Sequence, residues 1–398
     1  MRDLNMEGSA NSYLVRHVNE MLVLGLMRKH IELSIPEIER MTSLTYPTVS
    51  KVITSLKEKG LLEESGEGLS RGGRRPKLLR FRHDAGVFVG AEVDKTRIIV
   101  AGFSMNYRMI SKVVLPLQST NPSTVRECIV KGIEEVTASL EPHQVLYGVG
   151  IGCPGMIDPK AGTVISRSTL RWLQPVDLAG QIREDVGAPV FVQNDINVAA
   201  LGEMSRFDDG ETMDSWAYIS VATGVGSGIV LNHQILKGHA GGAGELGHLS
   251  VNCDGIACEC GSRGCLESYI STPALSRLLG IPEDDHSTAY MALQDRVRAL
   301  DPNALDIYHN TVKYLSTAII GLVNLLNPYA IMIGGAILEL GEPFLQDLRK
   351  AVGAGCGNVS FDPEQIFFSQ LGTDAVIYGG AVLADQHVFG VPQLAPAI

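Results

Sequence analysis

The strongest constraint on how this chain can fold is a cluster of one histidine and three cysteines. His248 precedes the pair Cys258 and Cys260, and Cys265 follows after a glycine-containing turn. One imidazole and three thiolates at this spacing suit a closed tetrahedral zinc site, which is usually structural. The alternative is that the cysteines are buried thiols that pack as small hydrophobes. The clustering favours a loop held in shape by one zinc ion per chain.

Two glutamates flank this cluster. Glu245 lies just before His248, and Glu267 lies just after Cys265. A loop stiffened by a metal would present both carboxylates beside the imidazole. Carboxylates and imidazoles are suitable partners for the hydroxyl groups of a polyol. The same stretch therefore predicts a binding site for a sugar-like ligand next to the metal.

Composition narrows the class of protein. A chain of 398 residues with 45% hydrophobic and 19% charged residues can bury large cores and form two or three domains. The apolar region at 318–338 is interrupted by Asn324, Asn327 and Pro328, and the first residues lack the apolar core of a signal peptide. Seven cysteines, four of them at 253–265, suit a reducing compartment with a metal site better than a disulfide framework. We expect a cytoplasmic protein without membrane contact.

A basic run marks a separate N-terminal module. The net charge is −11, yet residues 71–82 (RGGRRPKLLRFR) contain six basic residues and no acidic one. The net charge argues against nucleic acid binding by the whole surface but allows a local basic patch. This asymmetry predicts a module whose chemistry differs from the rest of the chain.

Three short helices are expected ahead of this run. Helical spacing of Val15, Val18, Leu22 and Leu26 predicts a first helix that ends near His30. A second helix should start at Ser34, where Ser34 and Glu37 form a capping box with Pro36 in the first turn. A third helix should start after Thr45, bury the apolar residues at 49, 52, 53 and 56, and stop at Gly60. Three short helices with short connections indicate a helix-turn-helix.

The third helix and a β-hairpin wing are the expected DNA contacts. In a helix-turn-helix the third helix enters the major groove. Segments 61–64 and 77–81 read as the two strands of a wing, and its arginines suit a narrow minor groove. The alternatives are a three-helix cap on an enzyme and a solvated basic linker. The predicted DNA-binding residues are Thr45, Tyr46, Thr48, Ser50, Lys51, Thr54, Arg71, Arg74 and Arg75.

From about Asp84 onward, strands alternate with helices. Apolar runs predict strands at 86–93, 98–103, 110–116, 146–152, 190–192, 218–222, 228–231 and 330–335, and helices are expected at 123–140, 303–326 and 374–388. An opening run of strands followed by alternation indicates an α/β fold. The last helix, at 374–388, should pack back on the first part of this α/β region. The sequence alone establishes no internal repeat.

Three more residues are candidates for a ligand site. Asn194 and Asp195 follow the strand at 190–192 and precede a helix expected near Asn197, and Gly155 follows the strand at 146–152. Ligands of α/β proteins gather at the carboxyl ends of strands, and a glycine there lets a ligand approach the backbone. The alternative is that Asn194 and Asp195 only cap the helix.

The run GH…CxCGxxGCxE, residues 247–267, resembles the signature of the ROK family, which contains sugar-responsive repressors and sugar kinases. The resemblance extends with gaps over nearly the whole chain, including the GGRRP segment that follows a winged helix-turn-helix in ROK repressors. Cys253 is not part of the signature. The resemblance implies a zinc ion on His248, Cys258, Cys260 and Cys265, and sugar contacts from Gly155, Asn194, Asp195, Glu245, His248 and Glu267.

The resemblance also implies the domain organisation. We expect a winged helix-turn-helix domain over residues 1–83 and two actin-like, ribonuclease H-like lobes over 84–398. The first lobe would cover about 84–195 and 374–398, and the second about 196–373. A cleft between the lobes would hold the sugar.

The first of the two phosphate-binding motifs expected in a ROK kinase is altered, which argues against catalysis. ROK kinases open with an Asp-x-Gly-Gly-Thr turn that holds phosphate, but here residues 90–96 read GAEVDKT and both glycines are lost. Glu92 and Asp94 would add negative charge, and two like charges 4 Å apart repel by about 4 kcal/mol at an effective dielectric of about 20. The second phosphate loop, ATGVGSG at 222–228, and the pair Gly334 and Gly335 are retained, although a tight hairpin uses the same glycines. If the chain were a kinase, Asp195 would be the general base.

These features predict a sugar-responsive transcriptional regulator, most simply a repressor of carbohydrate uptake or catabolism genes, without catalytic activity. Its expected partners are a double-stranded DNA operator, a sugar or sugar derivative, and further copies of the chain in a homodimer or homotetramer. Glucose, xylose, N-acetylglucosamine and phosphorylated sugars are all compatible effectors. The alternatives are an ATP-dependent sugar kinase with a DNA-binding appendage, and a regulator whose partner is another protein and whose cleft is vestigial.

Overall fold

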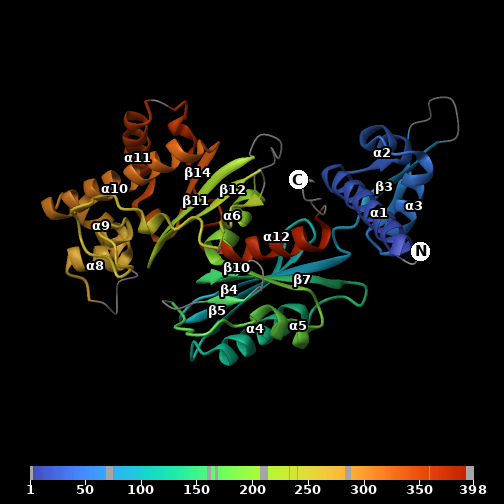
Figure 1. The fold of residues 1–398 in the computed structure, drawn as a ribbon, viewed down its shortest axis with the longest axis horizontal. Coiled ribbons are helices and arrows are strands. Elements are labelled where there is room, and N and C mark those ends of the chain that lie inside the picture. The colour runs from blue at the N-terminus through green and yellow to red at the C-terminus, as the bar shows by residue number, and fades with distance from the viewer. Residues whose placement is uncertain are drawn as a thin grey trace.

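The computed structural model describes residues 3–68, 75–158, 163–165, 169–206, 214–232, 234–239, 241–282, 288–357 and 359–390, with the side chains described from residue 14 onward. None of the described helices is long and apolar enough to cross a membrane. Figure 1 shows a small N-terminal head, in blue, beside two larger lobes that each contain a sheet.

The head contains the three predicted helices and the wing. Its elements are α1 (Asp3–Lys29), β1 (Leu33–Ser34), α2 (Ile35–Thr42), α3 (Tyr46–Glu58), β2 (Leu62–Glu67) and β3 (Lys77–Phe81), and the strands pair in the order β1-β3-β2. Ser34 and Glu37 form the predicted capping box, and Thr45 is the N-cap residue of α3. The helices and the hairpin are therefore confirmed.

The buried face of α1 differs from the apolar pattern that predicted the helix. Val15 and Leu22 are 55% and 42% exposed, whereas Met21, Leu24 and Met27 are buried. The methionines and Leu24 pack on the rest of the head because they share the side of α1 that faces the other helices. Helical spacing fixed the type of element but not the side that it buries.

The first lobe is a five-stranded sheet of order β10-β7-β4-β5-β6. Strands β4, β5 and β6 form an antiparallel meander, and β7 and β10 add in parallel. Helices α4 and α5 cover one face of the sheet (Figure 1). The bounds are β4 (Gly86–Val93), β5 (Arg97–Ser104), β6 (Met109–Pro116), α4 (Pro122–Thr137), β7 (Val145–Cys153), α5 (Leu178–Val186) and β10 (Val190–Asn194), with a small hairpin of β8 (Met156–Ile157) and β9 (Val164–Ile165).

The second lobe repeats this topology. Its sheet has the order β13-β12-β11-β14-β15, in which three antiparallel strands are again followed by two parallel ones. The bounds are β11 (Ser215–Val221), β12 (Val225–Leu231), β13 (Gln234–Ile235), η1 (Leu246–His248), α7 (Glu267–Ile270), α8 (Thr272–Leu279), α9 (Ala289–Arg298), α10 (Pro302–Leu326), β14 (Ala330–Gly334), η3 (Ala336–Leu340), α11 (Gly341–Gly355), η4 (Pro363–Gln365), β15 (Ile366–Phe368) and η5 (Gly372–Asp374). The largest buried core of the chain lies between this sheet and the helices α8 to α11.

Two helices lie between the sheets. Helix α6 (Asp195–Met204) follows β10 directly, and helix α12 (Ala375–Phe389) packs against α6, β7 and β4 (Figure 1). The prediction that the last helix packs back on the first lobe is confirmed. Helix α6 starts at Asp195, earlier than the expected start near Asn197, because Asn194 already serves as its N-cap.

Candidate functional site

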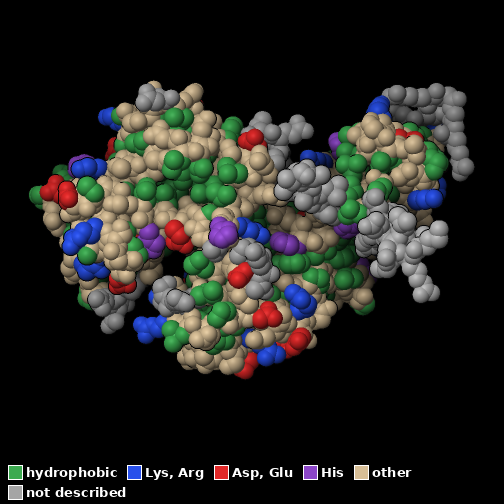
Figure 2. Space-filling model, viewed as in Figure 1, with side chains coloured by type: hydrophobic (Ala, Val, Ile, Leu, Met, Phe, Trp, Pro, Cys, Tyr) green, Lys and Arg blue, Asp and Glu red, His purple; other side chains and the backbone are tan. Residues whose placement is uncertain are grey.

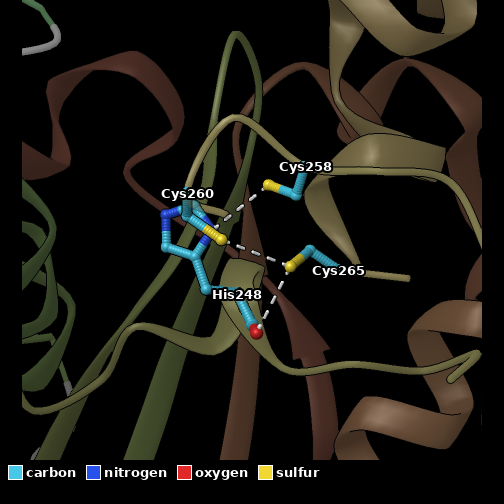
Figure 3. A group of neighbouring side chains, drawn as sticks. All are labelled: His248, Cys258, Cys260 and Cys265. Atoms are coloured by element: carbon cyan, nitrogen blue, oxygen red, sulfur yellow. Dashed lines mark hydrogen bonds between the residues drawn. The ribbon is translucent and has the colours of Figure 1, made fainter. Parts of the chain in front are cut away.

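The four predicted metal ligands lie together. The ligand atoms of His248, Cys258, Cys260 and Cys265 are all within 4.8 Å of one another, and Figure 3 shows the three sulfur atoms and the imidazole converging on one point. The Cys260 and Cys265 sulfurs are 3.6 Å apart, and the Cys258 sulfur is 3.8 Å from the His248 Nδ1. Ligands of a tetrahedral Zn–S site with bonds of about 2.3 Å are separated by roughly 3.8 Å. These atoms therefore fit around a single metal ion.

The loop backbone brings these ligands into position. His248 ends the short helix η1, and Cys265 pairs with Ser250 in an isolated bridge. Gly264 has a φ of +70°, and a side chain at this position would collide with the carbonyl oxygen of Asn252 at 1.7 Å. Burial alone would raise the pKa of the Cys258 thiol, but hydrogen bonds from Cys260 lower it to about 7, which makes a thiolate ligand available.

The first-lobe residues of the predicted sugar site meet where β7 and β10 end. The Asn194 side chain donates a hydrogen bond from Nδ2 to the Gly155 carbonyl oxygen at 3.0 Å. Its Oδ1 accepts from the backbone N–H groups of Ile196 at 3.0 Å and Asn197 at 3.2 Å. Asn194 therefore caps α6 and ties it to the loop after β7, so the capping interpretation and the site interpretation are both compatible with its position.

The second-lobe residues approach the same place from β12. Glu267 accepts a hydrogen bond from the backbone N–H of Val225 at 2.8 Å, at the end of the glycine-rich turn between β11 and β12. The loop that carries Glu245 and His248 packs closely on β12, since a side chain on Gly244 would meet the Ser227 carbonyl oxygen at 2.1 Å. Glu245 and His248 are exposed, while Glu267 is half-buried.

Electrostatics links one residue of each group, Asp195 and Glu245. The pKa of Asp195 is raised to about 6, mainly by burial and further by the carboxylates of Asp94 and Glu245. Asp195 belongs to the end of β10, whereas Glu245 belongs to the loop on β12, so carboxylates from both lobes converge. Figure 2 shows this face of the molecule hollowed between the lobes, with histidine and acidic side chains at the edge of the hollow.

Glu92 adds a feature that the sequence did not reveal. Its carboxyl group is largely buried, and one oxygen has no hydrogen-bond partner among the described residues. Burial raises the pKa of Glu92 to about 7, opposed by Arg97 and assisted by Asp94, Asp195 and Asp374. The carboxyl therefore sits among acidic groups and is partly protonated near neutral pH, so it carries less negative charge than we expected.

The predicted DNA-contacting face of α3 is accessible. Tyr46 is 56% exposed, Thr45, Lys51 and Thr54 are exposed, and Thr48 and Ser50 are half-exposed. The opposite face is buried through Val49, Val52, Ile53 and Leu56, as predicted. Of the wing arginines, Arg75 is exposed, while Arg71 and Arg74 lie outside the described residues.

Glu20 anchors α3 to α1. The hydroxyl of Ser55 and the ammonium of Lys59 donate to its two carboxylate oxygens at 2.7 Å and 2.6 Å. Glu20 is only 4% exposed. Because a buried carboxylate needs such partners, these contacts fix the orientation of α3 relative to α1.

Two family models match the chain. The ROK family model matches residues 85–387, and a MarR family model matches residues 17–75. The xylose repressor of Bacillus subtilis is 29% identical over 379 residues, which cover 95% of this chain and 97% of that protein. The glucokinase of Halalkalibacterium halodurans is 31% identical, but the match covers 75% of this chain and 95% of the glucokinase.

Among solved structures, too, a regulator aligns with nearly the whole chain, whereas a kinase aligns with about three quarters of it. The structure of a ROK family transcriptional regulator, a homolog of the E. coli MLC protein, has a TM-score of 0.77 at 23% identity, covering 95% of this chain and 98% of that chain. A ROK family glucokinase from Streptomyces griseus, in complex with glucose and AMPPNP, has a TM-score of 0.61 at 30% identity, covering 76% of this chain and its own whole length. The chain thus belongs to the ROK family and carries a MarR-like helix-turn-helix ahead of its ROK lobes.

Proposed function

We propose that this chain is a sugar-responsive transcriptional repressor, which binds operator DNA through residues 1–83 and a sugar in the cleft between its lobes. The observation that carries the proposal is a helix-turn-helix head with an exposed α3 face, packed onto ROK lobes whose candidate sugar residues converge. Similarity to the xylose repressor over 95% of the chain supports this function, because glucokinases match only about three quarters of it.

In this proposal, D-xylose is the first effector to test, since it is the sugar in the relative's name. Asp195, Glu245 and Glu267 would accept hydrogen bonds from sugar hydroxyls, and His248 would face the sugar with the ring nitrogen that does not bind metal. Gly155 would leave room for the ligand, while Asn194 would hold the loop and the start of α6 in position. Phosphorylated sugars and N-acetylglucosamine remain candidates of the same class.

We further propose that zinc occupies the cluster of His248, Cys258, Cys260 and Cys265. All four positions of a tetrahedral site would be filled by protein atoms, so the ion would stabilise the loop and leave no open position for catalysis. Its effect on the sugar would be indirect, by keeping Glu245, His248 and Glu267 in place.

DNA binding would require two heads at a fixed spacing. A helix-turn-helix dimer reads two half-sites about one helical turn apart, so a homodimer or homotetramer of this chain fits the proposal. A sugar that prefers one arrangement of the lobes would shift the spacing of the heads, within the limit set by that preference.

A sugar kinase with a DNA-binding head is the alternative, with Asp195 as general base. The raised pKa of Asp195 suits a base near neutral pH, and this observation favours the alternative. The cluster of Glu92, Asp94 and Asp374 near Asp195 opposes it, because a polyanionic nucleotide would be placed among acidic groups. Partial protonation of Glu92 reduces this repulsion without removing the charges of its neighbours.

Calorimetry can distinguish a sugar-responsive repressor from a sugar kinase. We would titrate the metal-loaded protein with D-xylose, then with other pentoses and hexoses, and in parallel with Mg-ATP. The repressor proposal predicts sugar binding that Asp195→Asn abolishes and that Asp185→Asn, a matched change on the surface of α5, leaves intact. It also predicts no detectable binding of Mg-ATP and no phosphorylated product. Nucleotide binding in the micromolar range with sugar turnover would establish the kinase instead.

The same panel tests the third possibility, a protein partner and a vestigial cleft. A ligand present at 100 times its dissociation constant stabilises a protein by about 2.7 kcal/mol. If no sugar in the panel raises the melting temperature, the cleft does not bind sugar and the search should turn to a protein partner.

A further inference from the structure

A buried ion pair joins the head to the C-terminal helix. Arg28, at the end of α1, donates from Nη1 to both carboxylate oxygens of Asp385 on α12, at 2.9 Å and 2.7 Å. The phenol of Tyr107 donates to the same carboxylate, and the guanidinium lies 5.2 Å and 5.3 Å from the ring centroids of Phe81 and Phe389. Among the described residues, head and lobe therefore meet at a charged contact that aromatic rings enclose.

This contact lies in a continuous core. Met21, Leu24 and Met27 of α1 belong to the same buried cluster as Phe88 of β4 and Ile377 of α12. Apolar packing alone can hold the two parts together, and a buried ion pair adds little stability on balance because its charges must be desolvated. Its geometry, in contrast, is directional, so the pair fixes how α1 is oriented relative to α12.

Helix α12 has no room to slide over the sheet beneath it. A Cβ on Gly90 of β4 would lie 1.8 Å from the Ile377 carbonyl oxygen, and a Cβ on Gly150 of β7 would lie 2.0 Å from the carbonyl oxygen of Gly380. Its contact with α6 is equally close, since a Cβ on Gly379 would lie 1.7 Å from the Val198 carbonyl oxygen. Helices α6 and α12 must therefore move together when either is displaced.

The candidate sugar site lies at the start of α6. Asp195 is the first residue of that helix, and Asn194 caps it. Displacement of α6 by a ligand would thus carry α12 with it and move Asp385. On the other side of the ion pair, α1 is fixed to α3 through Glu20 and its bonds to Ser55 and Lys59.

We propose that the Arg28–Asp385 pair is the joint that transmits sugar binding in the cleft to the DNA-contacting helix α3. The proposal rests on the proposed function and names the regulation of the same site. Arg28 and Asp385 are positioning residues in this account, and neither touches the sugar or the DNA. Without the pair, the apolar core would still hold the head, but α1 would no longer follow α12.

The test compares the sugar response of variants with that of the wild-type protein. The probe is a DNA duplex that the full-length wild-type protein selects from a random pool, and the sugar is D-xylose or whichever pentose or hexose binds in calorimetry. The measured quantity is the ratio of operator dissociation constants with and without saturating sugar. Couplings of this kind are typically 5- to 150-fold, so we expect a ratio of about ten for the wild type.

The variants are Asp385→Asn and Arg28→Gln, each alone and both together. We expect each single variant to reduce the ratio to within about twofold of unity, and the double variant to lose no more, because both changes break one interaction. Sugar affinity and DNA affinity without sugar should change much less than the ratio. Asp185→Asn, which breaks the surface pair of Asp185 with Arg126, should keep the wild-type ratio.

The outcomes separate this inference from the proposed function. A purely structural pair would lower the melting temperature of the variants and leave the ratio intact, and that result would overturn the inference while the proposed function stands. If no sugar changes the DNA affinity of the wild-type protein, both the inference and the proposed function are wrong. If Asp385→Asn does not fold, Arg28→Gln, which leaves Asp385 in place, decides the question alone.

Discussion

At the scale of single residues, the candidate cleft is dominated by carboxylates that influence one another. Asp195, Glu92 and Glu245 come from three different segments of the chain, yet the pKa values of Asp195 and Glu92 are both raised. Perturbed acidic groups gather at functional sites because binding requires polar groups in places that folding alone would leave apolar. In the proposed function, the acidic neighbourhood of Glu92 would disfavour a bound nucleotide.

Glu92 predicts a pH dependence of stability. Its pKa rises from 4.5 to about 7 on folding, so the folded state binds the proton more tightly than the unfolded state. Below about pH 4 both states are protonated and burial has no ionic cost. As the pH rises through 7 that cost develops fully, up to about 3 kcal/mol for a shift of this size.

Glu92→Gln should therefore stabilise the protein near pH 8 and have little effect near pH 4. Chemical denaturation of both proteins at the two pH values measures the difference. Equal stabilisation at both values would show that the carboxyl group of Glu92 is not held in its protonated form, and the proposed acidic environment would be wrong.

At the scale of elements, patterns among residues close in sequence predicted most elements, and of the long-range contacts only the packing of the last helix on the first lobe was predicted. The capping box at Ser34, the N-cap at Thr45 and the cluster at 248–265 all depend on residues close in sequence, so their patterns predicted the elements well. The contact of Arg28 with Asp385 joins residues 357 apart, and no local pattern marks it. The side of α1 that is buried was hidden for the same reason, because it depends on what packs against it.

The proposed zinc ion on the cluster of His248, Cys258, Cys260 and Cys265 predicts a selective effect of chelation. Removal of the ion should lower the melting temperature of the protein by roughly 4 °C or more, since a loss of 1 kcal/mol shifts a large domain by about 2 to 4 °C. Removal of the ion should also abolish sugar binding, because Glu245, His248 and Glu267 share this loop. Operator binding by the head should persist.

Elemental analysis, calorimetry and thermal unfolding check this expectation. Cys260→Ser should reproduce the effect of chelation, and Cys253→Ser should not, because the exposed Cys253 lies outside the cluster. A protein that carries no metal and binds sugar normally would contradict the structural role of zinc.

The wing predicts how DNA binding depends on salt. Arg74→Ala together with Arg75→Ala should weaken operator binding and make the slope of log K against log salt shallower by up to about two, because two cations that displace counterions from the DNA are lost. Arg298→Ala, at an exposed arginine of α9, is the matched control and should leave the slope unchanged. Equal slopes for the wing variant and the wild type would remove the wing from the DNA interface.

At the scale of the whole molecule, two lobes of the same topology enclose the cleft. The repeated arrangement of β4 to β10 and β11 to β15 was not visible in the sequence, because topology can repeat where side chains have diverged. Helices α6 and α12 lie between the sheets and connect the cleft to the head. Under the proposed function, this arrangement would connect a sugar in the cleft to helix α3.

The most direct test of the account is the operator affinity of the full-length protein, measured by fluorescence anisotropy with and without the sugar that binds in calorimetry. The account predicts specific DNA binding that weakens by about tenfold with sugar, and no such change in Asp195→Asn. An operator affinity that is the same with and without sugar, together with ATP-dependent phosphorylation of that sugar, would contradict it.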